Sequence, residues 1–134
     1  MLHRTVLNEM LDDEIATAEE CLGGRVESIS RTGPTISVHL GPDGPLIELD
    51  GRRYDSEPYR VRLVDPAGEP LTHEQWPAGM SLGQHPVLDR PFACIQGTYE
   101  YHAHPSHLTD HWSTYRNTIR LADLIDHLLR KAGR

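Results

Sequence analysis

Short segments of alternating apolar and polar residues constrain the fold of this chain most strongly. The alternation is clear over 35–40 and 59–63, and it predicts strands that bury one face. Residues 46–49 form a further short apolar strand, and residues 25–30 are a weaker candidate. We therefore expect an antiparallel meander of about four strands.

Turn-forming residues separate these strands. Residues 41–44 read Gly-Pro-Asp-Gly, a strong turn signal, and Asp50-Gly51 favours a tight hairpin after the next strand. Residues 65–91 are rich in proline and glycine, so they predict a long irregular segment, of a kind that is often functional. The apolar residues 92–95 then predict one more short strand.

Two amphipathic helices are expected to flank the strands. Apolar residues recur every three or four positions over 3–22, and Gly23-Gly24 ends that pattern. A second helix is expected over about 114–131, with Arg130 and Lys131 suited to its C-terminus. Helices at the two ends of an antiparallel meander indicate an α+β fold, as a single domain over 1–134.

Composition excludes several classes of protein. The net charge is −7 over 134 residues, which argues against a nucleic-acid binder. No apolar run is long enough to span a bilayer, and the N-terminus lacks the pattern of a signal peptide, so a cytoplasmic protein without a membrane partner is expected. Two cysteines are too few for a disulfide scaffold.

Potential metal ligands gather between residues 94 and 111. Thiolate, imidazole and carboxylate are the protein ligands that zinc prefers, and this stretch contains all three kinds. The potential ligands are Cys94, Glu100, His102, His104, His107, Asp110 and His111. Zinc is therefore the expected cofactor.

The spacing of these residues can be compared with strand geometry. If residues 99–104 are extended, Glu100, His102 and His104 point to the same side. Ligands two residues apart on a strand can share one ion. Solvent-exposed histidines would be the ordinary alternative.

Two further ligands need a change of chain direction. Pro105 would break the strand and allow His107 to return toward the ion. Cys94 can join the site only if the chain turns at Gly97; otherwise it is an ordinary buried thiol. Cys94, Glu100, His102, His104 and His107 are therefore the candidate ligands, of which at most four bind together.

These residues resemble a small bacterial family. The pattern Cys94, Glu100, then His residues up to His107, with Trp112 downstream, is similar to a predicted metal-binding domain named for its Cys, Glu, His and His residues. The resemblance implies an architecture like that of ubiquitin-conjugating enzymes. It also implies partners from bacterial operons, namely a ubiquitin-activating-like enzyme or a ubiquitin-like protein.

The wider resemblance to ubiquitin-conjugating enzymes covers the order of elements. Those enzymes run from a helix through a four-stranded meander and a proline-rich segment to Tyr-His-Pro-Asn, a catalytic cysteine, a tryptophan and C-terminal helices. Here Tyr101 to Pro105 stands where Tyr-His-Pro-Asn would stand, with Ser106 in place of Asn. No cysteine follows His104, so the resemblance implies a member that lacks the usual thioester nucleophile.

Three functions follow as expectations, and the sequence assigns no catalytic residue. The first is a zinc-binding, ubiquitin-conjugating-like partner or adaptor in a ubiquitin-like conjugation pathway. The second is a metal-dependent hydrolase or transferase in which zinc activates water, with Glu100 or Asp110 as general base. The third is a metal-free nucleophile beside His104, either Cys94 or Ser106.

Overall fold

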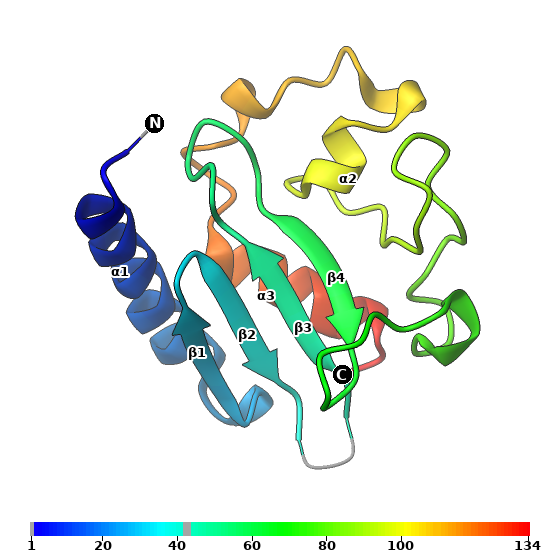
Figure 1. Cartoon of the computed structure of the whole chain (residues 1–134), viewed down its shortest axis with the longest axis horizontal. Coiled ribbons are helices and arrows are strands. Elements are labelled where there is room, and N and C mark those ends of the chain that lie inside the picture. Colours follow the sequence, from blue (N-terminus) through cyan, green and yellow to red (C-terminus); the bar gives the residue numbers. More distant parts are fainter. Residues whose placement is uncertain (1, 42–43) are drawn as a thin grey trace.

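The computed structural model describes residues 2–41 and 44–134. Its main elements are two long helices, one short helix and four strands, arranged as in Figure 1. In chain order they are α1 (Arg4–Leu22), β1 (Ser28–Thr32), β2 (Thr35–His39), β3 (Leu46–Asp50), β4 (Arg60–Val64), α2 (Tyr99–His102) and α3 (Leu121–Lys131). This order confirms the predicted α+β class, with an N-terminal helix, a four-stranded meander and a C-terminal helix.

The sheet is a simple meander in the order β1-β2-β3-β4, with every neighbouring pair antiparallel. Ile29 pairs with Val38, Val38 with Ile47, and Ile47 with Leu63. These four side chains are buried, so they form one apolar row across the sheet. The alternation seen in the sequence therefore sets the face that each strand buries.

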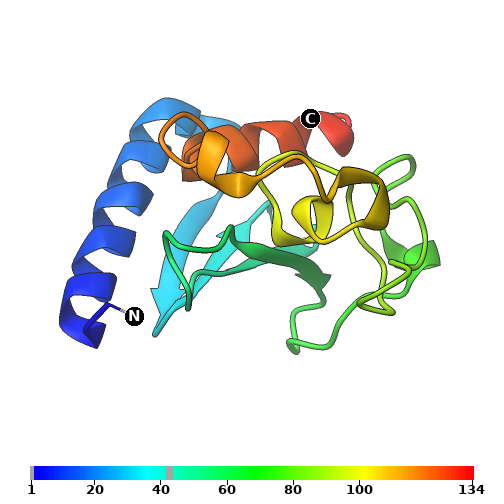
Figure 2. The same cartoon turned by 90° about the horizontal axis from the view of Figure 1, so that it is seen from above.

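Both long helices pack against this apolar face, as the view from above in Figure 2 shows. Leu11 and Ala18 of α1 and Leu124 and Leu128 of α3 are fully buried between the helices and the sheet. Within the described residues, no helix covers the other face of the sheet, which is turned toward the viewer in Figure 1. That face carries the polar and charged side chains of the strands.

The two helices match their predictions to different degrees. α1 is confirmed, and Gly23 ends it with a φ of 55°. α3 begins at Leu121, whereas the sequence predicted a start near residue 114. The earlier residues form a 3-10 turn at Trp112–Thr114 and further turns. The helix begins late because the Asp123 carboxylate accepts the Arg120 N–H at 2.8 Å and caps the chain there.

The connection between β3 and β4 also differs from its prediction. The prediction of a tight hairpin at Asp50-Gly51 is wrong, because β3 ends at Asp50 and β4 begins only at Arg60. The Gly51 N–H donates to the Pro34 carbonyl at 2.9 Å instead, which leads the chain away from β3. The predicted turn at 41–44 includes positions 42 and 43, which lie outside the described residues.

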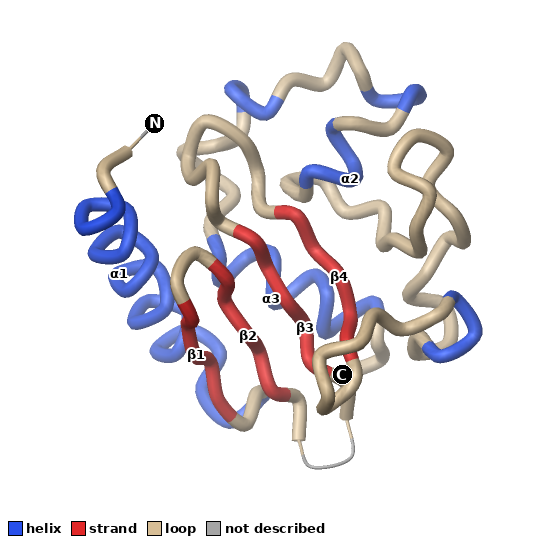
Figure 3. The backbone as a smooth tube through the Cα atoms, in the orientation of Figure 1, coloured by secondary structure: helices blue, strands red, loops and turns tan. Residues whose placement is uncertain are grey.

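The strand predictions are confirmed in three cases and corrected in two. β2, β3 and β4 fall at the expected places, and β1 begins at Ser28, three residues later than the weak candidate at 25–30. Residues 92–95 form no strand. Phe92, Ala93 and Ile95 are buried and Cys94 is half-buried, but they lie beside the sheet rather than paired with it. They belong to the loop region, residues 65–120, much of which lies beyond β4 in Figure 3.

The helix α2 occupies the outer edge of β4 instead. The Tyr99 N–H donates to the Tyr59 carbonyl at 2.8 Å, and the Val61 N–H donates to the Glu100 carboxylate at 2.9 Å. An edge strand exposes unpaired backbone groups, and these contacts satisfy two of them. α2 therefore takes the place that a fifth strand would have taken.

None of the helices in the described part of the chain has the length and apolar character needed to cross a membrane.

Candidate functional site

Cys94 and His107 form the centre of the candidate site. The Cys94 Sγ lies 3.6 Å from the His107 Nε2, although the two residues belong to separate loops. Cys94 is half-buried because its neighbours Ala93 and Ile95 are packed into the core. Pro105 starts a 3-10 turn at Pro105–His107, which returns His107 toward the thiol. The structure therefore brings together one predicted thiol and one predicted imidazole.

The ring of Tyr101 holds the His107 imidazole in place. The two rings are stacked, with centroids 4.0 Å apart and planes inclined by 13°. The Tyr101 hydroxyl donates to the Asp110 carboxylate at 2.6 Å, which fixes the tyrosine in turn. Tyr101 therefore contacts His107 through its ring and Asp110 through its hydroxyl.

Asp110 gathers three donors from different parts of the loop region. Its carboxylate accepts the Tyr101 and Tyr115 hydroxyls, both at 2.6 Å, and the Gln96 side-chain amide at 2.9 Å. The hydrogen bonds from Tyr101, Tyr115 and Gln96, in that order, lower the pKa of Asp110 to about 2. Asp110 therefore stays ionised at neutral pH and joins residues 96, 101 and 115 around the site.

A shallow pocket of about 440 Å³ opens beside the thiol. Residues 94–96 form one wall, and His127, Arg130 and Lys131 at the end of α3 form the other. Burial raises the pKa of the Cys94 thiol, and the charge of Lys131 acts in the opposite direction. The thiol is therefore protonated at neutral pH unless a neighbouring base takes its proton, and His107 is in position to do so.

Glu100, a predicted metal ligand, has a structural role. Its side chain is buried, accepts the Val61 N–H and pairs with Arg90. Burial raises the pKa of this carboxyl, and the contacts with Val61 and Arg90 act in the opposite direction. The carboxylate oxygens therefore bind groups at the edge of β4 and do not reach the Cys94 thiol and the His107 imidazole, which together are called the thiol pair.

His102 is also engaged by the backbone. Its Nε2 accepts the Gly97 N–H at 3.2 Å, and its Nδ1 donates to the Asp110 carbonyl at 2.7 Å. Burial is the main reason that the pKa of His102 is lowered, so the ring is neutral. Its one lone pair is already used, which leaves no ring nitrogen for a metal ion in this conformation.

His104 lies beside the pair without joining it. Its ring centroid is 5.8 Å from that of His107, and it stacks on Phe92. Its Nδ1 accepts the Ser106 N–H at 3.1 Å and lies 2.7 Å from the Ser106 hydroxyl oxygen. Such contacts are typical of a turn that begins at a side-chain cap.

The predicted ligand set therefore does not converge on one ion. Residues 99–102 are helical rather than extended, because the Thr98 hydroxyl caps α2 by accepting the Tyr101 N–H. Residues two apart in a helix point in different directions, which separates Glu100 from His102. Among the described residues, no group of three or more His, Cys, Asp or Glu side chains is placed to hold a metal ion.

The sequence-based reasoning missed His85. Its ring is buried, with the Nε2–H donating to the Glu100 carbonyl at 2.9 Å. Its Nδ1 accepts the N–H groups of Val87 and Leu88, at 3.1 and 3.0 Å. His85 therefore ties the proline-rich loop to α2. The His-Pro pair at 85–86, placed before Cys94, was the signal that could have identified it.

Comparisons with known proteins show a distant similarity and do not place the chain in a family. No protein-family model matches the chain. The chain is similar to a protein named "Uncharacterized protein y4jH" from Sinorhizobium fredii, with 26% identity over 117 residues. The match covers 65% of this chain and 57% of that protein, so the chain spans little more than half of its relative's length.

Proposed function

We propose that the chain is an unconventional ubiquitin-conjugating-like protein of a bacterial ubiquitin-like conjugation pathway, with Cys94 as the residue that carries the acyl group. The contact of the Cys94 Sγ with the His107 Nε2 carries this proposal. A thiol beside an imidazole and open to a pocket is the arrangement that a cysteine nucleophile needs. The expected partners are a ubiquitin-activating-like enzyme and a ubiquitin-like protein.

The order of elements supports the proposal. In the resemblance described above, a His-Pro pair precedes the catalytic cysteine, and a tryptophan and a helix follow it. His85-Pro86, Cys94, Trp112 and α3 stand in that order. This correspondence replaces the one through His104-Pro105, after which no cysteine follows. Val87 stands in place of the Asn of that motif.

The geometry suggests how the thiol would react. His107 Nε2 takes the proton of the Cys94 thiol, which burial would otherwise keep in place. The Cys94 sulfur then attacks the carbonyl carbon of a thioester on the activating enzyme. A new thioester forms on Cys94, the bond to the first sulfur breaks, and the activating enzyme's thiolate leaves.

A synthetic peptide thioester ending in Gly-Gly tests this chemistry directly. The protein carries Cys21→Ser, so that Cys94 is the remaining thiol, and mass spectrometry follows the attached peptide. We expect a product on Cys94 that dithiothreitol removes. His107→Gln should slow its formation about a hundredfold, the lower end of the range for loss of a general base. An activating-like enzyme, its ubiquitin-like protein and ATP should give the same type of product.

The second cysteine provides the control. Cys21 is exposed at the end of α1, far in sequence from any of the site residues. In the wild-type chain Cys94 should react faster than Cys21, although Cys21 is the more accessible thiol. Equal rates at the two cysteines, or an unchanged rate in His107→Gln, would contradict the proposal.

Zinc binding is the second candidate function. The Cys94 Sγ and the His107 Nε2 are 3.6 Å apart, and two such ligands on a tetrahedral zinc ion are also about 3.6 Å apart. Cys94 and His107 supply two ligands, so the other ligands of the zinc ion would be groups that do not contact this pair in the structure. Zinc added to the metal-free protein should protect Cys94 from iodoacetamide in this case. Protection that persists in His107→Gln would exclude this pair as the site.

A further inference from the structure

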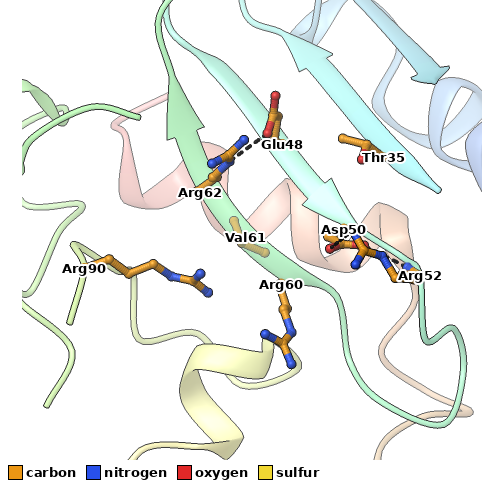
Figure 4. Close-up of a pocket in the computed structure, with 8 residues that line it drawn as sticks. All are labelled: Thr35, Glu48, Asp50, Arg52, Arg60, Val61, Arg62 and Arg90. Atoms are coloured by element: carbon orange, nitrogen blue, oxygen red, sulfur yellow. Dashed lines mark hydrogen bonds and ion pairs between the residues drawn. The ribbon is translucent and has the colours of Figure 1, made fainter. Parts of the chain in front are cut away.

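Arginines gather at one end of the open face of the sheet. A pocket of about 300 Å³ is formed there by eight residues. They are Thr35, Glu48, Asp50, Arg52, Arg60, Val61, Arg62 and Arg90. Figure 4 shows Arg90 extending from the loop region toward Arg60 and Arg62 on β4. Four guanidinium groups at one pocket are notable in a chain with a net charge of −7.

Three of the four arginine side chains are more exposed than the two acidic side chains of the pocket. The Arg52, Arg62 and Arg60 side chains are 70%, 46% and 42% exposed. Those of Asp50 and Glu48 are only 33% and 21% exposed. A partner that approaches the pocket therefore meets positive charge first.

Two of the arginines are only loosely paired. The Arg52 and Asp50 side chains approach to 3.7 Å, and those of Arg60 and Glu57 to 3.9 Å, both longer than a hydrogen bond. The Arg60 guanidinium lies 4.0 Å from the centre of the Tyr99 ring, which fixes its plane. A guanidinium that is already positioned loses little side-chain entropy when it binds a planar anion.

From these observations we propose that the arginine pocket is a docking site for an acidic peptide segment of a partner protein. Each of the loosely paired guanidinium groups can donate two parallel hydrogen bonds to one carboxylate. Recognition of acidic segments by arginine clusters is a common mode of peptide binding. Glu and Asp side chains along an extended segment would meet Arg60 and Arg52 in turn. The proposal does not depend on the chemistry of Cys94.

A peptide suits this pocket better than a nucleic acid does. A polyphosphate backbone needs a continuous positive track, because each phosphate that lacks a cation gains nothing. Here Glu48 and Asp50 interrupt the arginines, and acidic residues dominate the chain as a whole. Separate carboxylates can contact the exposed guanidinium groups without approaching these acidic side chains.

The test uses the full chain and a hexaglutamate peptide, followed by NMR chemical shifts of the backbone amides at low salt. We expect saturable shifts centred on β3 and β4, with hexaglutamine of equal length giving none. The double variant Arg52→Gln/Arg60→Gln should weaken binding about fivefold, and added salt should weaken it further. The absence of hexaglutamate binding at low salt would overturn the proposal.

A second double variant controls for net charge. Arg4→Gln/Arg25→Gln removes the same charge from α1 and the turn after it, away from the pocket, and should leave the affinity nearly unchanged. Equal weakening by the two double variants would overturn the proposal. It would also be overturned if oligothymidylate bound as tightly as hexaglutamate, or if an equal concentration of inorganic phosphate displaced the peptide. Cys94→Ser should bind hexaglutamate normally, so failure here is distinct from failure of the acyl-carrier function.

Discussion

Two regions of the molecule are built in different ways. The framework, which consists of α1, the four strands and α3, is held together by buried apolar side chains. The loop region, residues 65–120, contains three of the four buried polar or charged residues of the described chain. These three are His85, Thr98 and Glu100, and the fourth, Glu14, lies on α1.

The difference shows how an irregular segment can carry a precise site. Regular elements satisfy their own backbone groups, whereas a loop must find other partners for them. Here His85, Thr98 and Glu100 all bind backbone N–H or carbonyl groups. The loop region is therefore fixed by directional contacts, and the thiol pair is supported by the same network.

Glu100→Ala should have the largest effect on stability, because it tests the directional contacts directly. The change leaves the Val61 N–H and the Arg90 guanidinium without their acceptor. Removing one partner of a buried ion pair costs about 3–5 kcal/mol, and we expect about 3 because Arg90 is 33% exposed. Urea unfolding at neutral pH measures the loss. Glu74→Ala on the exposed surface is the control, and an equal loss in both would show that the loop region does not depend on Glu100.

Gly97→Ala examines the place where the two regions meet. Gly97 has a φ of +101°, and an added Cβ would lie 2.6 Å from Ile119 Cγ2 and 2.9 Å from Leu124 Cδ2. Gly79 also has a positive φ, at +80°, but open space around it. Both alanine variants are strained, and only the first is overpacked, so Gly97→Ala should be less stable than Gly79→Ala by about 2 kcal/mol. Equal melting temperatures would mean that the loop can move away from α3 at no cost.

Asp110→Asn should produce a smaller effect that depends on pH. The carboxyl pKa is lowered to about 2 in the folded chain, below its ordinary value of 3.8. Asp110 therefore stabilises the fold above about pH 4, and this contribution is lost as the pH falls toward 2. The difference in unfolding free energy between wild type and Asp110→Asn should shrink over that range in urea titrations. A difference that stays constant from neutral pH to about 2 would contradict this role.

Periodic burial explains how much of the fold could be predicted. Ile36 and Val38 are buried with a less buried residue between them, and so are Val61 and Leu63. This alternation predicted the correct strands, because each strand buries one face. The strand predicted at residues 92–95 rested on apolar content rather than on alternation, and it is wrong: these residues fill space beside the sheet. Apolar content alone does not distinguish a paired strand from a buried loop.

The candidate site was only partly predictable for a related reason. The turn at Pro105 brings the His107 ring to the Cys94 thiol. The metal ion that the two residues were expected to share stays a prediction. The sequence did not show that Glu100 would be used by an edge strand or that His102 would bind the backbone at Gly97. These roles depend on contacts between distant segments, and no local pattern encodes them.

The smallest expected effect separates two contributions of Tyr101 to the thiol pair. Tyr101→Phe keeps the ring stacked on His107 and removes the hydroxyl contact with Asp110, whereas Tyr101→Leu removes both. If stacking holds the imidazole against Cys94, alkylation of Cys94 by iodoacetamide should stay nearly unchanged in Tyr101→Phe and slow about threefold in Tyr101→Leu, a modest loss for a positioning contact. Mass spectrometry in the Cys21→Ser background measures both rates. Equal slowing in the two variants would assign the orientation of His107 to Asp110, and the site would then depend on the polar network of the loop region rather than on the packing of the rings.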